Sequence, residues 1–388
     1  MKVIFYNTPL AWLQLTRQKG RLLIALSGIA FAVILIFMQL GFQASLFDSA
    51  TQFHQSLNAD LVLISARSKS LSYMRTFSWR RLYQVFGIDG VESISPVYIE
   101  FGDWRNPVNG NFRTIYVYAF QPGDSVFKFP EVAANLSKLQ LQENILFDRA
   151  SRKEYGPIAL EFERHQIITT ELSSKKVNVV GLFTLGPSFG ADGNIIMSDL
   201  NFLRLFSRYR KIGEIDIGLI KLKTNANAQN ILKKIQANLP KDVKVLTHQD
   251  FVEFEKTYWQ TSTSIGFIFT LGVSMGFIVG TVIVYQILFS DVSNHLSEYA
   301  TLKAMGFRNI YLEFIVLQEA MILATLGYIP GFALTLGVYD LTKNATSLPI
   351  VMTTDRALLV LCLTILMCII SGLVAVRRLR KAEPAELF

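Results

Sequence analysis

Four long stretches without a charged residue constrain this chain more than any other feature. They hold 26, 34, 20 and 20 residues and lie between Arg21 and Asp48, between Lys256 and Asp291, between Glu319 and Asp340, and between Arg356 and Arg377. A helix needs about 20 apolar residues to cross about 30 Å of hydrocarbon. Each stretch is long enough, so the sequence predicts four transmembrane helices and excludes a wholly soluble or a disordered chain.

Basic residues beside the predicted spans indicate their orientation. Lys19 and Arg21 precede the first span, and Arg377, Arg378 and Arg380 follow the last. Lys and Arg concentrate on the cytoplasmic side, so both termini are predicted to be cytoplasmic. The first apolar run is longer than the 7 to 15 residues typical of a signal peptide and is therefore read as a retained anchor. The expected fold class is a membrane protein with four transmembrane α-helices, both ends inside, and a large external α+β domain between helices 1 and 2.

The spans divide the chain into nine predicted segments. In order they are a cytoplasmic amphipathic segment (1–21), span one (22–44), the external α+β domain with a helical stalk (45–264), span two (265–289), a cytoplasmic coupling helix (290–313), span three (314–338), a short external loop (339–356), span four (357–376) and a cytoplasmic tail (377–388). The external segment of 220 residues is far too long for a connector and is expected to fold as a domain.

Short β-rich runs alternate with helical ones inside the external segment, which predicts an α+β domain in two lobes. The predicted strands are 60–65, 93–101, 112–120, 176–183 and 215–222, and the predicted helices are 73–86, 200–207 and 226–239. Residues 45–55 and 250–264 lack Gly and Pro, so we expect them to continue the first two spans outward as the stalk. The glycine-rich segment 186–194 is predicted to be a hairpin loop, with a mobile partner contact as the alternative.

The sequence contains no recognisable catalytic or cofactor site. A Gly-Lys dipeptide, which a Walker A motif requires, does not occur, and the four histidines are scattered rather than paired at metal-ligand spacing. Cys362 and Cys368 lie six residues apart in the last span and point in different directions, so they cannot bridge. The net charge of +8 is too evenly spread to indicate nucleic acid as a partner.

Glycines repeat every fourth residue in span two, at Gly272, Gly276 and Gly280. A face without side chains lets two helix backbones approach closely, so we predict a transmembrane packing face, with a hinge as the alternative. Gly272 to Gly276 also fits the G-x-S-x-G pattern of a serine nucleophile. An intramembrane hydrolase built on Ser274 is the rival hypothesis, but no His or acid lies within ten residues of it.

The cytoplasmic link between spans two and three is predicted to be a short amphipathic helix lying under the membrane. Apolar residues recur at helical spacing, and Gly306 supplies a left-handed position at which helices commonly end. A helix held between two spans would transmit a displacement caused by a cytoplasmic partner to both spans. The candidate coupling residues are His295, Glu298, Tyr299, Leu302, Lys303, Ala304, Met305, Gly306 and Phe307.

Glu319 lies early in span three, where a carboxylate is costly unless it reaches the interface or has a partner. One interpretation is that Glu319 snorkels to the interface or pairs with Lys303 or Arg308. The other is a role as a coupling acid.

These features together resemble the MacB/FtsX-like permeases of ABC transporters, over essentially the whole chain. The family pattern after span two is Glu-Ile-Gly/Ala-x-Leu-Lys-Ala-Leu-Gly-Phe/Ala, and this chain has Glu298-Tyr-Ala-Thr-Leu-Lys303-Ala-Met-Gly306-Phe307. His295, Leu296 and Ser297 stand where the family often has arginines. The tail 381–387 resembles the family's Pro-x-x-Ala-Leu ending, and segments 8–21 and 57–65 are similar to the DevC group of cyanobacterial permeases.

The resemblance implies a non-enzymatic permease subunit of an exporter in a bacterial, specifically cyanobacterial, inner membrane, with the large domain in the periplasm. It implies a separate ABC ATPase that binds ATP and magnesium, a homodimer, a periplasmic membrane-fusion adaptor, a TolC-like outer-membrane channel and a glycolipid-like amphiphile as substrate. Two alternatives share the membrane layout: an FtsX-like regulator of cell-wall hydrolases, whose external domain is usually far smaller, and a LolC/E-like subunit for lipoprotein extraction.

Overall fold

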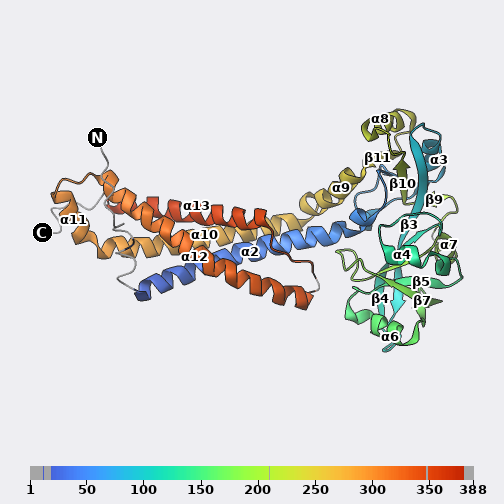
Figure 1. Cartoon of the computed structure of the whole chain (residues 1–388), viewed down its shortest axis with the longest axis horizontal. Helices are drawn as coiled ribbons and strands as arrows, with labels where there is room; N and C mark the ends of the chain where they lie inside the picture. The colour runs from blue at the N-terminus through green and yellow to red at the C-terminus, as the bar shows by residue number, and fades with distance from the viewer. Residues whose placement is uncertain (1–11, 13–18, 209, 347, 380–388) are drawn as a thin grey trace. The chain divides into compact units, whose positions relative to one another are not determined.

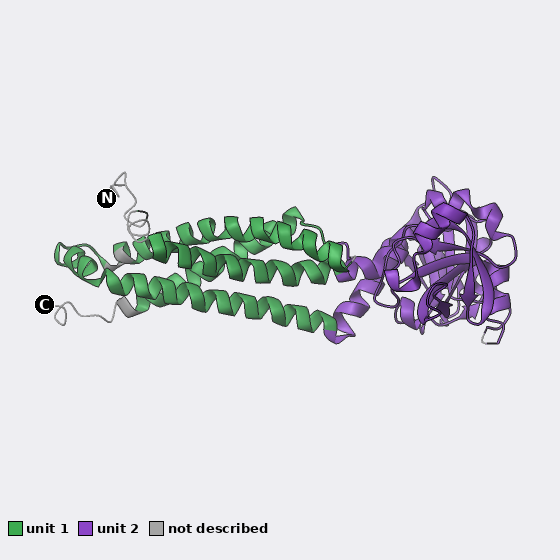
Figure 2. Ribbon diagram, turned by 90° about the horizontal axis from the view of Figure 1, so that it is seen from below, with its two compact units in different colours: residues 1–45, 265–346, 350–388 green, residues 46–264, 347–349 purple. Residues whose placement is uncertain are grey.

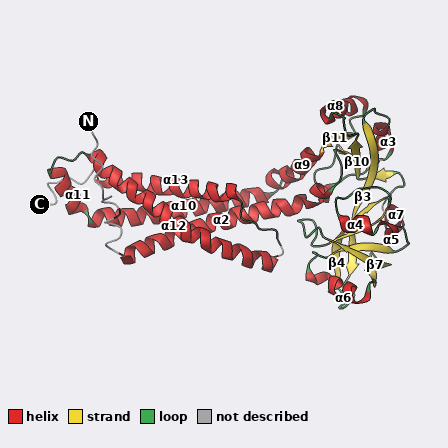
Figure 3. Cartoon of the chain, viewed as in Figure 1, coloured by secondary structure: helices red, strands yellow, loops and turns green. Residues whose placement is uncertain are grey.

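The structure is a computed structural model and describes residues 12, 19–208, 210–346 and 348–379. Two compact units make up the chain (Figure 2). The membrane unit comprises residues 1–45, 265–346 and 350–388, and the extramembrane unit comprises residues 46–264 and 347–349. In the described ranges the membrane unit is helical, whereas the extramembrane unit combines strands with short helices (Figure 3).

Four helices of the described chain are long and apolar enough to cross a membrane. They are α2 (Lys19–Ser56), α10 (Ser264–Asn294), α12 (Asn309–Thr346) and α13 (Thr354–Leu379), and α11 (Leu296–Ala304) joins α10 to α12. In both views the membrane-unit parts of these helices lie side by side (Figures 1 and 2). The prediction of four transmembrane helices, with an α+β domain between the first and the second, is confirmed.

Side-chain hydroxyls tie the helices of the membrane unit to one another. Tyr339 of α12 donates to the carbonyl of Phe37 over 2.5 Å, and Tyr328 of α12 donates to the carbonyl of Ala357 over 2.9 Å. Ser371 of α13 donates to the carbonyl of Thr281 over 2.7 Å. Apolar burial gives helices little reason to associate in lipid, so such bonds and close packing stabilise the bundle.

The helix ends differ from the predicted segment boundaries. Because α12 continues to Thr346 and α13 begins at Thr354, most of the predicted loop 339–356 is helical. The structure describes only residue 12 and residues 19–21 of the predicted N-terminal segment, and only residues 377–379 of the predicted tail.

A nine-stranded sheet forms the centre of the extramembrane unit in the described residues, in the order β11-β1-β10-β3-β4-β8-β5-β7-β6. The strands are β1 (Leu61–Ser65), β3 (Val91–Arg105), β4 (Phe112–Phe120), β5 (Asn144–Asp148), β6 (Ile168–Leu172), β7 (Lys175–Phe183), β8 (Asn194–Ser198), β10 (Ile217–Leu222) and β11 (Val243–Thr247). A separate ribbon pairs β2 (Phe77–Ser78) with β9 (Glu214–Ile215).

Strand β3 joins two halves of this sheet. Its first part, from Val91 to Val97, pairs with β10, and its second part, from Val97 to Arg105, pairs with β4. Trp104 of β3 also pairs with Leu172 of β6, which closes the second half on itself. The two predicted lobes are therefore two half-sheets that share one long strand.

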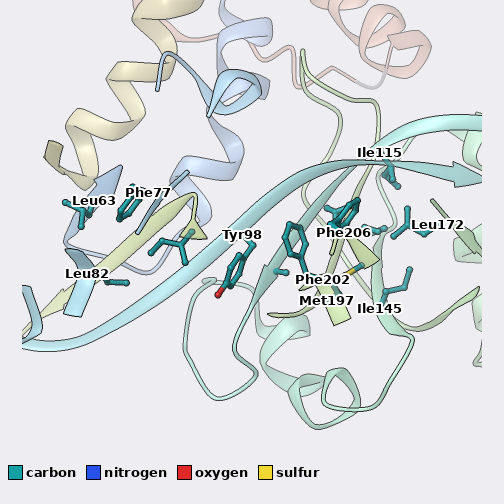
Figure 4. Packing of buried hydrophobic residues seen from close by; sticks show 14 of the residues in the cluster. Leu63, Phe77, Leu82, Tyr98, Ile115, Ile145, Leu172, Met197, Phe202 and Phe206 are labelled. Carbon is teal, nitrogen blue, oxygen red and sulfur yellow. The ribbon is translucent and has the colours of Figure 1, made fainter. Parts of the chain in front are cut away.

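Both faces of the sheet are buried, and side chains alternate between them as the strand period requires. In β4, Ile115 and Val117 belong to one hydrophobic cluster, whereas Tyr116 and Tyr118 belong to the other. Figure 4 shows part of the first cluster, in which Tyr98 lies beside Phe202. Burial on both faces explains why these strands read as nearly continuous apolar runs.

Short helices flank the sheet, and three of them begin at capping side chains. Ser198, Asn227 and Thr247 each accept a hydrogen bond from the backbone N–H three residues later. The helices are η1 (Leu71–Tyr73), α3 (Arg80–Phe86), α4 (Pro130–Ala134), α5 (Leu136–Leu139), η2 (Lys153–Tyr155), α6 (Ile158–His165), α7 (Asp199–Leu205), α8 (Ala228–Asn238) and α9 (His248–Thr261).

Three predictions for this unit are wrong. The predicted helix 73–86 is not continuous: Tyr73 ends η1, Phe77 and Ser78 form β2, and the α-helix begins only at Arg80. The predicted hairpin 186–194 connects β7 to β8, which are not neighbours, since β5 lies between them. The predicted second stalk helix, 250–264, is interrupted, because α9 ends at Thr261 and α10 begins at Ser264. The first stalk segment, 45–55, is helical as predicted.

Candidate functional site

The candidate coupling site is centred on α11, which Figure 1 shows at one end of the helix bundle. Tyr299 is buried and belongs to a hydrophobic cluster with Val292 of α10, Ile315 of α12 and Val376 of α13. Leu302 packs against the same cluster from the next turn. One face of α11 is therefore fixed to the ends of three helices, so a displacement of α11 acts on all three.

Gly306 ends α11 in the left-handed conformation, with φ of +92°. The N–H of Gly306 donates to the carbonyl of Lys303 over 3.0 Å, and the N–H of Phe307 donates to that of Leu302 over 3.1 Å. This pair of bonds is the Schellman motif, which satisfies carbonyls that the end of a helix leaves free. The left-handed position predicted for Gly306 is present.

The other face of α11 and the turn after it are exposed. Glu298 and Ala304 are exposed, Met305 is 63% exposed and Phe307 is 42% exposed. The Phe307 ring lies 4.9 Å from that of Tyr311, at the start of α12, instead of folding back onto α11. Methionine and aromatic side chains are enriched at protein interfaces, so this exposed surface is suited to a protein partner.

His295 lies at the junction of α10 and α11 and is buried. Its Nδ1 is 3.0 Å from the carbonyl oxygen of Asp291 and 3.7 Å from the carboxylate Oδ1 of the same residue. Both contacts join one helical turn to the next, so His295 stabilises the junction of α10 and α11. Lys303, also predicted as a coupling residue, is half-buried.

Glu319 is fully buried in α12. Its carboxyl group adjoins that of Asp291 in α10, and among the described residues no donor lies within hydrogen-bond distance of either carboxylate oxygen. No ion pair joins it to Lys303 or Arg308 among the described residues, so the predicted pairing is wrong for this conformation. A buried acid without such a partner marks a functional position more often than a structural one.

The predicted glycine face of α10 packs inside the chain. A Cβ on Gly276 would lie 3.1 Å from Cγ1 of Ile36, and a Cβ on Gly280 would lie 2.8 Å from that of Ala32. A Cβ on Gly272 would collide with the side chain of Gln39. These three contacts are with α2, and Sδ of Met367 in α13 also lies against Gly280, so close packing of α10 against α2 and α13 explains the repeat.

Ser274 lies on the exposed side of the same helix. Its hydroxyl donates to the carbonyl of Thr270 over 2.8 Å, a bond within the helix. The hydroxyl of Ser274 is therefore engaged within its own helix. In the ranges that the structure describes, no group of three His, Cys, Asp or Glu side chains is placed to hold a metal ion.

Residues 46–56 of α2 lie in the extramembrane unit and pack tightly there. The Phe53 ring stacks on Tyr118 of β4 at 4.3 Å. Nε2 of His54 lies 3.4 Å from Oε2 of Glu255 in α9, and the same oxygen accepts from the N–H of Leu71 over 2.7 Å. Sequence reasoning missed Glu255, because no pattern distinguishes it from the other acids of an amphipathic helix.

The 184–193 loop also packs against α9. Asp148 accepts hydrogen bonds from the N–H groups of Leu185 and Gly186, over 3.0 and 2.7 Å, and the Phe189 ring stacks on Trp259 at 4.5 Å. Burial raises the pKa of Asp148, and the hydrogen bonds that it accepts oppose the shift. The loop is thus fastened to its own domain.

Comparison with known families identifies the region that contains α11. Residues 269–384 match the FtsX-like permease C-terminal family. This stretch is an FtsX-like permease domain. It includes most of α10 and all of α11, α12 and α13, so the predicted resemblance to FtsX-like permeases is confirmed over this stretch. The narrower similarity to the DevC group stays a prediction.

Two solved structures are similar to the extramembrane part. The periplasmic region of MacB from Actinobacillus actinomycetemcomitans aligns over 51% of this chain and 94% of its own, at 10% identity with a TM-score of 0.36. The extracellular domain of the noncanonic ABC-type transporter YknZ from Gram-positive bacteria aligns over 49% of this chain and 100% of its own, at 10% identity with a TM-score of 0.34. No curated protein matches the chain significantly.

Proposed function

We propose that this permease is the membrane subunit of a MacB-like ABC exporter in a bacterial inner membrane. A separate ATPase subunit binds ATP and magnesium, and its movement is transmitted through α11 and the bundle to the large domain in the periplasm. That domain drives an amphiphilic, glycolipid-like substrate toward an adaptor and a TolC-like channel. The permease works as a homodimer of the DevC type.

The construction of α11 carries this proposal. Its buried face is fixed to three helix ends through Tyr299, and its exposed face presents Glu298, Met305 and Phe307. A connector between two spans has no need for a capped helix with such a division. A helix that transmits movement from an ATPase to the spans needs one face that contacts the ATPase and one face that contacts the spans.

Helix α2 supplies the route to the extramembrane unit. It is one continuous helix from Lys19 to Ser56 and contributes residues to both units. In the membrane unit it lies against Gly276 and Gly280, and in the extramembrane unit it is fastened through Phe53 and His54. An unbroken helix transmits displacement along its axis better than a flexible linker does.

The spans themselves favour transport outside the membrane. Each charge-free stretch of the sequence lies within or near one span, and Glu319 is the acid that flanks the third. A pathway for a polar substrate through the bilayer needs polar side chains along it. Mechanical transmission to the periplasmic domain does not.

Association with the ATPase tests this function. The full-length permease is purified in nanodiscs with its cognate ATPase, and the double variant Met305→Glu/Phe307→Glu is compared with the wild type. We expect the variant to fold normally, because both side chains are exposed, but to lose ATPase co-purification and the stimulation of ATP hydrolysis.

Ile212→Glu provides the matched control, since Ile212 is 90% exposed in the extramembrane unit. It should retain the ATPase fully. Normal ATPase binding and stimulation by the double variant would show that α11 is not the docking element.

A further inference from the structure

Loops of the extramembrane unit line an open cavity of about 840 Å³. One wall is formed by the segment that leads from β1 to β2, and the other by the turn before β11. The polar residues that line the cavity include Arg67, Lys69, Tyr73, Arg75, Lys241 and Asp242. The cavity is separate from α11 and has no part in the proposed coupling.

Four cations in this lining lack ion-pair partners. Among the residues that the structure describes, none of these four is paired with a carboxylate, and all of them are exposed: Arg67, Lys69, Arg75 and Lys241. The one acid in the lining, Asp242, is already bound by Arg81, with Nη2 and Oδ2 3.1 Å apart. The cavity lining therefore concentrates positive charge with which no carboxylate of the described residues is paired.

Backbone hydrogen bonds hold the charged loops in place. The N–H of Ala66 donates to the carbonyl of Asp242 over 2.9 Å, which ties the two walls together. The N–H of Arg75 donates to Oγ of Ser68 over 3.0 Å, and the N–H of Lys69 donates to the carbonyl of Tyr73 over 3.3 Å. Like charges held close together repel one another, and a bound anion relieves that repulsion.

We propose that this cavity is a binding site for a phosphate-bearing ligand. Two guanidinium groups offer paired N–H donors that match phosphate oxygens, and two ammonium groups add charge without a fixed direction. A concave site lined by four cations suits a compact phosphate group, whereas a flat charged patch suits an acidic protein surface. The phosphate is supplied either by a free phosphate ion or by a lipid headgroup.

Calorimetric titration of the full-length permease in nonionic detergent tests the proposal. One arm adds inorganic pyrophosphate, and the other adds a short-chain phosphatidylglycerol below its micelle concentration. Both should bind, more weakly as salt rises, because the cations are exposed. Tighter binding of the phosphatidylglycerol identifies a lipid headgroup as the ligand, and tighter binding of pyrophosphate identifies a free phosphate.

The triple variant Arg67→Gln/Arg75→Gln/Lys241→Gln should weaken binding roughly tenfold or more. The matched control, Lys153→Gln/Lys233→Gln/Lys234→Gln, removes three exposed charges of the same unit outside the cavity and should bind as the wild type does. Circular dichroism checks that each variant folds. If the triple variant does not fold, the single variants Arg67→Gln and Arg75→Gln are titrated in its place. Absence of binding in both arms, equal loss in the control, or tighter binding of a polyglutamate peptide would overturn the proposal.

Discussion

The N–H of Phe307 donates to the carbonyl of Leu302 over 3.1 Å and closes the last turn of α11. That bond forms only because Gly306 between them has a φ of +92°. A Cβ on Gly306 would meet no atom within 4 Å, so space does not select glycine there. The backbone conformation selects glycine instead. A substitution at this position therefore changes the turn without changing side-chain packing.

Replacing Gly306 by Val should therefore uncouple the permease without unfolding it. A β-branched residue in the left-handed region costs about 1–2 kcal/mol or more, so the turn rearranges and α11 loses its fixed end. We expect the ATPase to bind but to hydrolyse ATP at its unstimulated rate. Asn tolerates positive φ, so Gly306→Asn should preserve most of the stimulation.

Gly337→Val controls for the loss of a glycine in general. Gly337 is an exposed residue of α12 without a positive φ, and a Cβ added to it would meet no atom within 4 Å. The substitution should leave hydrolysis unchanged. Equal rates of ATP hydrolysis with Gly306→Val and Gly306→Asn would contradict the claim that coupling requires a residue that tolerates positive φ at this position.

Enlarging the glycine face of α10 should destabilise the membrane unit. A Cβ at Gly280 would already lie 2.8 Å from that of Ala32 and would collide with Met367 of α13, so Gly280→Leu forces α10 away from α2 and α13. Overpacking of this kind costs about 1–3 kcal/mol. We expect a lower thermal midpoint of the detergent-solubilised chain, measured by size-exclusion after heating, and no comparable loss for Gly337→Leu.

Removing the carboxylate of Glu255 should loosen α9 and the neighbouring segment of α2. Its oxygens accept from the N–H of Leu71 over 2.7 Å and from Nε1 of Trp259 over 2.8 Å, and it faces His54. Buried donors left unsatisfied cost about 1–3 kcal/mol. Glu255→Leu should speed hydrogen exchange of residues 46–56 and 71–73. An exposed acid of the same helix supplies the control, because Glu253→Leu is expected to leave both segments protected.

Asp216 should make stability depend on pH in an unusual direction. Burial raises its pKa to about 6, against the attraction of Arg210, whereas in the unfolded chain its pKa lies near the ordinary value of 3.8. The folded state thus binds more protons between about pH 4 and pH 6, and the contribution of Asp216 to stability falls as pH rises through that window. From about pH 4 to pH 6, the free energy of unfolding of Asp216→Asn should rise relative to that of the wild type by on the order of 3 kcal/mol. Parallel thermal midpoints of the two proteins from pH 4 to 7 would exclude this account.

The sequence predicted the features that depend on local rules. Charge-free runs located four spans, and Gly306 located the end of α11, because bilayer thickness and the left-handed conformation each restrict the residues allowed. It did not predict β5, β8 and β11, short strands whose identity depends on pairing with distant partners. The His54–Glu255 contact and the basic cavity were missed for the same reason, since each unites segments that are far apart in the chain.

Hydrogen–deuterium exchange of the nanodisc complex with its ATPase tests the central claim of mechanical coupling most directly. A non-hydrolysable ATP analogue should change exchange in residues 296–304 and also in residues 46–56. In Gly306→Val, the change at residues 46–56 should disappear. Nucleotide-dependent exchange confined to the ATPase, or a wild-type change at 296–304 with none at 46–56, would contradict it.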